Sequence, residues 1–304
     1  MFRRIACSLA LIVLGLSVSL ARAEEKGKVA PKFFDSNGVK IHYNVSGEGE
    51  PVVLVHGFTA SIQAQWGMPG IIGKLAKDYQ VVALDNRGHG RSDKPHDPKQ
   101  YGPEMINDVL RLMDHLNIRK AHVVGYSMGG FMTGYLVTHH PDRVISATLG
   151  GAGWRKPDDT RFNVMDQLAD SLDAGKGIGP LIVLLTPANR PKPTDEQIEA
   201  INSMLLLTND SKALAACIRG MVGLTVTEDQ WRANKVPTLA LIGSDDPLKV
   251  GVDELAEVAA NVKVDVLEGA DHMTTFQRPQ FVDDLKAFLS EHSKVPAAVG
   301  AGAN

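Results

Sequence analysis

Short apolar runs alternate along the chain with stretches in which apolar residues recur every three or four positions. The runs have the length and composition of buried strands: PVVLV (51–55), QVVAL (80–84), AHVVGY (121–126), VISATLG (144–150), PTLALIG (237–243) and KVDVL (263–267). Helical spacing is clearest in two sets: Ile106, Val109, Leu110, Met113 and Leu116, and Phe281, Leu285, Phe288 and Leu289. Strands that alternate with helices predict an α/β fold, with a mostly parallel sheet covered by helices on both faces.

Two further features complete this pattern. The segment KFFDSNGVKIHYNV (32–45) predicts a hairpin that turns at residues 36–38. Additional helices are expected at about 71–77, directly after Ser127, and from about Val252.

The alternation stops between residues 155 and 236. No strand pattern occurs there, and three stretches have helical spacing: 163–172, 194–207 and 212–221. We expect a helical cap, inserted between a first core part (24–154) and a second (237–292). Open α/β sheets bind ligands at the carboxyl edge of the sheet, so we place the cap over that edge. A long surface excursion without function is the alternative, although long ordered insertions usually act as lids.

The two ends of the chain differ from the body. Arg3 and Arg4 precede an apolar stretch over residues 5–20, and the small residues ARA follow at 21–23. This order predicts a secretory signal peptide over residues 1–23, and so a secreted or periplasmic protein without stable membrane insertion after cleavage. An uncleaved anchor is the alternative, but the run is shorter than the roughly 20 residues that a spanning helix needs. Residues 293–304 are rich in small side chains and are predicted to be disordered.

Composition and charge narrow the class of partner. The chain has 304 residues and a formal net charge of −3, without a basic block. We therefore expect a small-molecule substrate and no nucleic acid. Neither H-E-x-x-H nor paired-cysteine spacing occurs, so no metal and no cofactor are expected. The oligomeric state stays open.

The stretch VVGYSMGG (123–130) carries the first candidate chemistry. Ser127 lies between an apolar run and a helical pattern, which places it at a strand-to-helix corner. Such a corner requires close backbone approach, and Gly125 and Gly129 stand two residues before and after the serine. The pattern G-x-S-x-G in this context predicts a nucleophile. A serine in an ordinary glycine-rich turn is the competing interpretation.

A serine hydroxyl needs a base, and the base needs a carboxylate to orient it. His272 follows a predicted strand, which puts it on the same edge of the sheet as Ser127. The loop GSDDP provides Asp246 and Asp245, of which we prefer Asp246; Asp158 or Asp159 is a weaker substitute. Serine, aspartate and histidine then follow one another along the chain in the order that α/β-hydrolases use.

The oxyanion that forms in acyl transfer requires fixed N–H donors. One typically comes from the residue after the nucleophile, here Met128. The second is expected from HGFT (56–59), with the N–H of Phe58, whose side chain is also a candidate wall of the pocket. Arg87 and His89, in DNRGHGRS, look like ligands, but we favour a structural role for that loop.

Five segments together resemble landmarks of the α/β-hydrolase fold superfamily, in family order from Pro51 to Leu289: VVLVHGF, VVALDNRGHGRSDKP, VVGYSMGG, LALIGSDDPL and GADHMTTFQRPQFVDDLKAFL. The chain is most similar to capped serine hydrolases of the esterase and haloperoxidase-like branch. The resemblance implies Ser127 as nucleophile, His272 as base, Asp246 as acid, and Phe58 with Met128 as oxyanion donors. Serine at the nucleophile position speaks against haloalkane dehalogenases and epoxide hydrolases, which carry aspartate there.

The expected activity is hydrolysis of a carboxylic ester of a small to medium apolar substrate through an acyl-enzyme. A lactonase, a cofactor-free perhydrolase and a carbon–carbon bond hydrolase are compatible with the same residues. A low-turnover ligand receptor on the same fold is the alternative from another class. Trp154, Trp231 and residues 204–207 are candidates for lining an apolar pocket, although we favour burial in the core for each of them.

Overall fold

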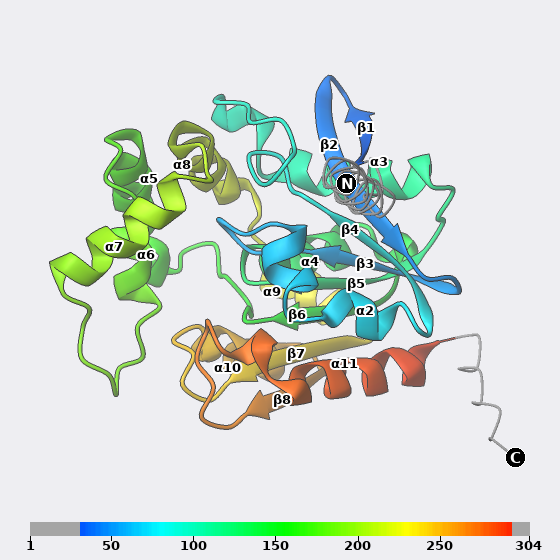
Figure 1. Ribbon diagram of the computed structural model, residues 1–304. Helices are drawn as coiled ribbons and strands as arrows, with labels where there is room; N and C mark the ends of the chain where they lie inside the picture. Colours follow the sequence, from blue (N-terminus) through cyan, green and yellow to red (C-terminus); the bar gives the residue numbers. More distant parts are fainter. Residues whose placement is uncertain (1–30, 294–304) are drawn as a thin grey trace, which may run out of the picture. The chain divides into compact units, whose positions relative to one another are not determined.

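The computed structural model describes residues 31–293, and eight strands form its central sheet. They are β1 (Lys32–Ser36), β2 (Val39–Ser46), β3 (Glu50–Val55), β4 (Tyr79–Leu84), β5 (Ala121–Tyr126), β6 (Val144–Gly150), β7 (Thr238–Gly243) and β8 (Val262–Leu267). Their order is β1-β2-β4-β3-β5-β6-β7-β8 (Figure 1). β2 runs antiparallel to β4, and every pair from β4 to β8 is parallel. The predicted α/β-hydrolase architecture with a mostly parallel sheet is confirmed.

The first two strands form the predicted hairpin. Its two central residues, Asn37 and Gly38, have φ angles of 57° and 84°. Positive φ at both positions is the geometry of the tight turn whose twist matches that of the flanking strands, and Asn-Gly is the pair that adopts it at least cost.

Alternate residues of the strands point to opposite faces, and each face has its own apolar core. Val52 and Leu54 pack with α2 (Ile71–Leu75) and α11 (Pro279–His292). Val53 and Val55 pack with α3 (Pro103–His115) and α4 (Met128–His139), and α10 (Lys249–Val258) adds Leu255 to that same cluster. Full burial of one such side chain contributes about 1.5–3 kcal/mol. A strand buried on both faces needs apolar residues at every position, which explains the continuous apolar runs of the sequence.

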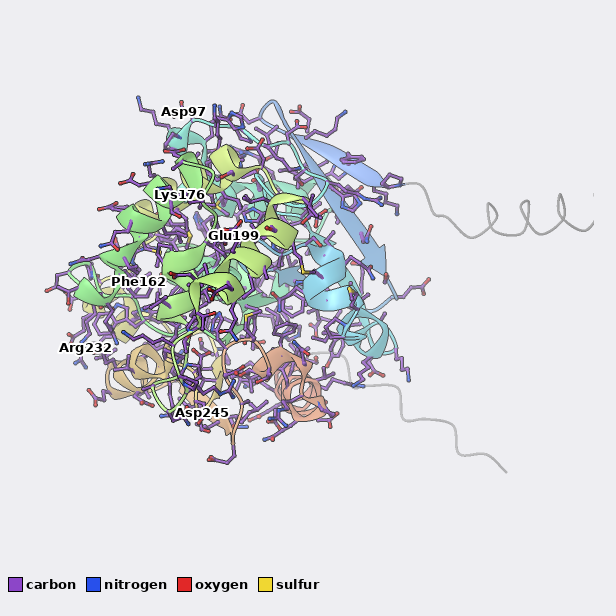
Figure 2. All side chains as sticks on the ribbon, turned by 60° about the vertical axis from the view of Figure 1, so that its left-hand side comes forward. Asp97, Phe162, Lys176, Glu199, Arg232 and Asp245 are labelled. Carbon is purple, nitrogen blue, oxygen red and sulfur yellow. The ribbon has the colours of Figure 1, made fainter. Side chains whose placement is uncertain are left out.

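Residues 155–236, here called the insert, contain five helices and, among these described residues, no strand. They are α5 (Val164–Asp173), α6 (Gly179–Leu184), α7 (Asp195–Leu206), α8 (Ser211–Gly220) and α9 (Glu228–Ala233). α5 to α8 gather on one side of the sheet (Figure 1), and Figure 2 turns them toward the viewer with Phe162, Lys176 and Glu199 labelled among them. Three of these helices match the predicted stretches, whereas α6 and α9 were not predicted.

The insert divides its packing between two cores. α5 and α8 bury Leu168, Leu172, Leu214 and Ile218 against one another. Trp231 of α9 instead belongs to the main core beside α4. The last helix of the insert is therefore packed as part of the sheet's own helical layer, and the division of the chain into core and cap stays a prediction.

Short helical turns connect the longer elements. Five are 3-10 segments (Pro98–Gln100, Pro141–Arg143, Thr160–Phe162, Met221–Gly223 and Thr275–Gln277), and one is π-helical (Ile62–Gly67).

Within residues 31–293, no helix has the length and apolar character that a membrane span requires. The predicted signal peptide (1–23) and residues 294–304 of the predicted tail lie outside the described residues.

Candidate active site

Ser127 lies at the turn between β5 and α4, in a conformation that side chains rarely adopt. Its φ is 54° and its ψ is −118°, which costs a non-glycine residue of order 1–3 kcal/mol. A Cβ on Gly125 would lie 1.9 Å from the Gly129 carbonyl oxygen, and one on Gly129 would lie 2.0 Å from that of Val55. Both contacts are impossible for any other residue. The two glycines therefore permit the turn that holds the Ser127 hydroxyl at the carboxyl edge of the sheet.

The structure brings three of the predicted residues into one hydrogen-bonded row. The Oγ of Ser127 lies 3.0 Å from Nε2 of His272, and Nδ1 of His272 lies 2.8 Å from Oδ2 of Asp246. Ser127, Asp246 and His272 follow β5, β7 and β8, which are parallel strands, so their carboxyl ends meet at the same edge. His272 and Asp246 are each 3% exposed. This burial shields their hydrogen bond from competition with water.

The alternative acids lie elsewhere. Asp245 accepts a hydrogen bond from Asn189 at 3.3 Å, and Asp159 forms an ion pair with Arg161. Neither contacts His272, nor does Asp158, so Asp246 is the carboxylate that the structure places at the imidazole.

The loop that carries His272 is fixed by residues that the sequence analysis missed. The hydroxyl of Tyr126 donates to the His272 carbonyl oxygen at 2.5 Å. The carboxylate of Asp271 accepts from the N–H groups of Met273 and Thr274 at 3.1 and 2.9 Å. Burial would raise the pKa of Asp271, but the hydrogen bonds from Thr274 outweigh it and the pKa lies below its usual value. The D-x-x-T spacing, in which a carboxylate bonds to nearby N–H groups, was the signal available in the sequence.

Phe58 and Met128 lie beside Ser127, as predicted, and both line a cavity with it. Outside the regular hydrogen bonding of helices and strands, their N–H groups have no acceptor within residues 31–293.

His56, which was not predicted, fixes the loop of Phe58. Its Nδ1–H donates to the Gly57 carbonyl oxygen at 2.8 Å, and its Nε2 accepts from the N–H of Asn86 at 3.0 Å. Burial lowers the pKa of His56, so the ring is neutral and its tautomer is set by these two bonds.

Arg87 and His89 contact other parts of the fold. Arg87 donates two hydrogen bonds to Asp108, at 2.7 and 2.6 Å. Nδ1–H of His89 donates to the Arg87 carbonyl oxygen at 3.0 Å, and the ring packs 5.6 Å from that of Phe58. Neither residue lines a pocket with Ser127.

Two cavities meet at Ser127. The larger has a volume of about 660 Å³ and is lined by His272 and by residues of the insert, among them Leu181 and Leu185. The smaller, of about 60 Å³, shares Ser127, Leu181 and Leu185 with it. The volume and the mixed lining of the larger cavity are those of a small-molecule site.

The favoured interpretation, burial in the core, is confirmed for Trp154 and Trp231 and is wrong for Met204 and Leu207. Trp231 is buried in the main core, and Trp154 lines neither cavity at Ser127. Met204, in α7, and Leu207, directly after it, are 74% and 85% exposed. Part of the apolar lining comes instead from α6, one of the two helices that were not predicted.

Comparison with known proteins decides the family. A family model described as "alpha/beta hydrolase fold" matches residues 50–279, which include every residue of the row. The chain belongs to this family. This alpha/beta hydrolase is similar to a non-heme chloroperoxidase of Streptomyces lividans, with 31% identity over 84% of this chain and 97% of the relative. It is also similar to a 2-hydroxymuconate semialdehyde hydrolase of Pseudomonas sp. strain CF600, with 26% identity over 84% and 92% of the two chains.

A similar solved structure agrees with the fold. The crystal structure of an enol-lactonase from Burkholderia xenovorans LB400 matches with a TM-score of 0.69 and 24% identity, covering 85% of this chain and 99% of that chain. The expected esterase and haloperoxidase-like resemblance is confirmed at the level of the family. Family membership supports an enzyme, and the relatives' names include lactonase, hydrolase and peroxidase activities.

Proposed function

We propose that this alpha/beta hydrolase is a serine hydrolase that cleaves a carboxylic ester through an acyl-enzyme. The observation that carries the proposal is the hydrogen-bonded row of Ser127, His272 and Asp246 at a pocket that admits a small molecule. A nucleophile within reach of a base, with the base oriented by a third group, is the arrangement that activates a serine hydroxyl.

In the first half of the reaction, Ser127 Oγ attacks the ester carbonyl carbon while its proton moves to Nε2 of His272. The carbonyl oxygen becomes negatively charged and accepts hydrogen bonds from the N–H groups of Phe58 and Met128. The C–O bond to the alcohol then breaks, and His272 gives its proton to the departing oxygen. An acyl group remains on Ser127.

In the second half, water attacks the acyl carbon and His272 accepts a proton from that water. The bond to Ser127 Oγ breaks, and the proton returns to the serine as the carboxylic acid leaves. Asp246 keeps Nδ1 of His272 protonated and stabilises the imidazolium that forms twice in the cycle. No group is consumed, so the enzyme turns over repeatedly.

The lining supports a substrate that is apolar over most of its length. Leu181, Ile182 and Leu185 of the insert and Phe276 of the core line the larger pocket. Burial of the substrate's apolar surface against them contributes about 25 cal/mol per Å² before the costs of association.

Hydrolysis of p-nitrophenyl esters of increasing acyl length tests the proposal. The wild-type protein should show multiple turnovers, and Ser127→Ala should reduce kcat by about 10³-fold or more. Ser203→Ala is the matched control, since Ser203 is exposed on α7 and lines neither cavity; its turnover should equal that of the wild type. Turnover that survives Ser127→Ala would contradict the assignment of the nucleophile.

Absence of turnover by the wild type would contradict ester hydrolysis itself. The lactone, carbon–carbon and perhydrolysis reactions would then be assayed with the same pair of variants. Ligand binding without turnover in all of them would indicate a receptor on this fold.

A further inference from the structure

The smaller cavity at Ser127 contains one charged residue in an otherwise apolar lining. Every lining residue other than Ser127 and Arg155 is a Phe, Met, Leu or Ile. Arg155 lies in the loop between β6 and the short helical turn Thr160–Phe162, at the start of the insert. Arg155 therefore lines the same small cavity as Ser127.

The protein leaves most of the hydrogen-bonding capacity of Arg155 unused. A guanidinium has five N–H donors. Within residues 31–293, the acceptor that this side chain has is the Met221 carbonyl oxygen at 3.5 Å, beyond the usual range of about 2.7–3.2 Å. Its Cζ lies 4.9 Å from the centre of the Phe162 ring, a cation–π contact that satisfies no donor.

Arg155 differs in its ion pairing from the other arginines that are buried or half-buried. Among residues 31–293, every other arginine that is buried or half-buried forms an ion pair with a carboxylate: Arg87, Arg111, Arg143, Arg161 and Arg219. Arg155 does not. Asp159, the carboxylate whose charge acts on it, is held by Arg161 in a two-pronged pair.

Burial lowers the pKa of Arg155, although arginine stays protonated at every pH of interest. A half-buried cation that forms no ion pair is costly, and a carboxylate offers it two parallel charge-assisted hydrogen bonds. An anion that enters the cavity can therefore form an ion pair with the guanidinium of Arg155, which has none within the described residues.

We propose that Arg155 binds a carboxylate carried by the substrate, so that this enzyme acts on half-esters of short dicarboxylic acids. The ester carbonyl lies at Ser127, the apolar acyl chain lies along the cavity, and the free carboxylate reaches Arg155. A volume of about 60 Å³ has room for roughly four to six water-sized groups, which limits the acyl chain to a few carbons. This inference rests on the proposed ester hydrolysis and names its substrate class.

The larger cavity contains two cations that are less suited to this role. Arg190 is already paired with Asp271, at 2.5 Å. Lys192 is exposed, so its charge is screened by solvent. Lys192 nevertheless provides the matched control, because its substitution removes a pocket cation of the same charge.

The first test measures binding in the Ser127→Ala background, in which the esters stay intact. Ligand-observed NMR titration compares monomethyl with dimethyl succinate, glutarate and adipate. We expect the half-ester of the best-fitting length to bind about 10- to 100-fold more tightly than its diester, as one charge-assisted pair provides. Arg155→Met, which keeps an apolar stem beside Phe162, should abolish this preference, and Lys192→Met should retain it.

Two results would overturn the proposal: equal binding of half-ester and diester, or a preference that disappears with Lys192→Met and survives Arg155→Met. Circular dichroism checks that each variant is folded. If Arg155→Met is not, Arg155→Gln removes the charge and keeps a polar side chain, and the same loss of preference is required of it. A structural role alone would weaken binding of half-ester and diester equally.

The second test separates this inference from the proposed function. kcat/KM is measured for monomethyl glutarate and for p-nitrophenyl butyrate with the wild type and Arg155→Met. A drop of about 10- to 100-fold confined to the half-ester supports both proposals. Equal drops for the two esters overturn the carboxylate site and leave ester hydrolysis standing. Arg155-dependent half-ester binding without hydrolysis of either ester contradicts the proposed function and leaves the carboxylate site standing.

Discussion

Two histidine–aspartate pairs in this protein have the same bond and different surroundings. In both His272–Asp246 and His42–Asp85, Nδ1 of the imidazole lies 2.8 Å from Oδ2 of the carboxylate. In both, the two residues are buried. Each aspartate follows a central strand of the sheet, β7 or β4.

The difference lies in what else each pair contacts. Asp85 also accepts hydrogen bonds from the N–H groups of Ile62 and Arg91, at 2.7 and 2.9 Å, and the His42 ring packs 5.2 Å from that of Phe33. These contacts join β1, β2, the end of β4, the π-helical segment and the loop of Arg91. Around the other pair, Nε2 of His272 faces a serine hydroxyl and a pocket.

A buried histidine–aspartate bond is therefore not evidence of catalysis by itself. What distinguishes the pair at His272 is the third group on its Nε2 and the access of a small molecule to that group. Within the described residues, the pair at His42 has no such third group and no pocket beside it. Its contacts hold parts of the fold together.

The largest expected difference between the pairs is in activity. Asp246→Asn should lower kcat toward esters by about 10⁴-fold, because an amide does not hold His272 in the reactive tautomer or stabilise its cation. Asp85→Asn should change kcat by less than about threefold in protein that remains folded. Steady-state kinetics on both variants checks this, and equal losses would show that the two pairs are coupled.

The next difference is in the dependence of stability on pH. Burial would raise the pKa of Asp85, but the hydrogen bond from His42 and the two backbone N–H donors outweigh it and lower the pKa to about 2, from 3.8. Because the folded-state pKa is the lower one, the stabilisation is complete above about pH 4 and is lost as pH falls from about 4 to 2. The shift corresponds to about 2 kcal/mol of unfolding free energy.

Urea unfolding at pH 5, 4 and 3 measures this loss. Asp85→Asn should be less stable than the wild type at pH 5, and the gap between them should narrow as pH falls. A gap that stays constant with pH would contradict the proposed link between Asp85 ionisation and stability, since the remaining carboxylates are common to both proteins.

The parts of the fold and the candidate site that could be predicted from the sequence are those set by local constraints or by the order of strands along the chain. The turn at Ser127 was predictable because its constraint is local: glycines two residues away on each side leave space for the backbone. His272 was predictable because chain order and strand ends determine which loops share an edge. α9 was missed although Thr227 and Gln230 form a capping box, a signal that the sequence does contain.

Contacts set by tertiary packing were not predictable. His56 is recognisable as an anchor only once Asn86, from another strand's end, lies against it. Arg155 is unremarkable in the sequence beside Trp154 and Lys156. Every other buried or half-buried arginine of residues 31–293 forms an ion pair with a carboxylate and Arg155 does not, a difference that no periodicity encodes.

The smallest expected effect concerns the support of the His272 loop. Tyr126→Phe removes the hydrogen bond from the tyrosine hydroxyl to the His272 carbonyl oxygen and keeps the ring, which packs 5.0 Å from that of Phe276. One such bond stabilises by about 0.5–1.5 kcal/mol, so kcat should fall by less than about tenfold and KM should be nearly unchanged. Among residues 31–293, no tyrosine hydroxyl donates to His42, and Asp85→Asn in the same background should therefore add its stability loss independently. A loss of kcat as large as that of Asp246→Asn would instead show that the bond from Tyr126, as much as the carboxylate, positions the imidazole against Ser127.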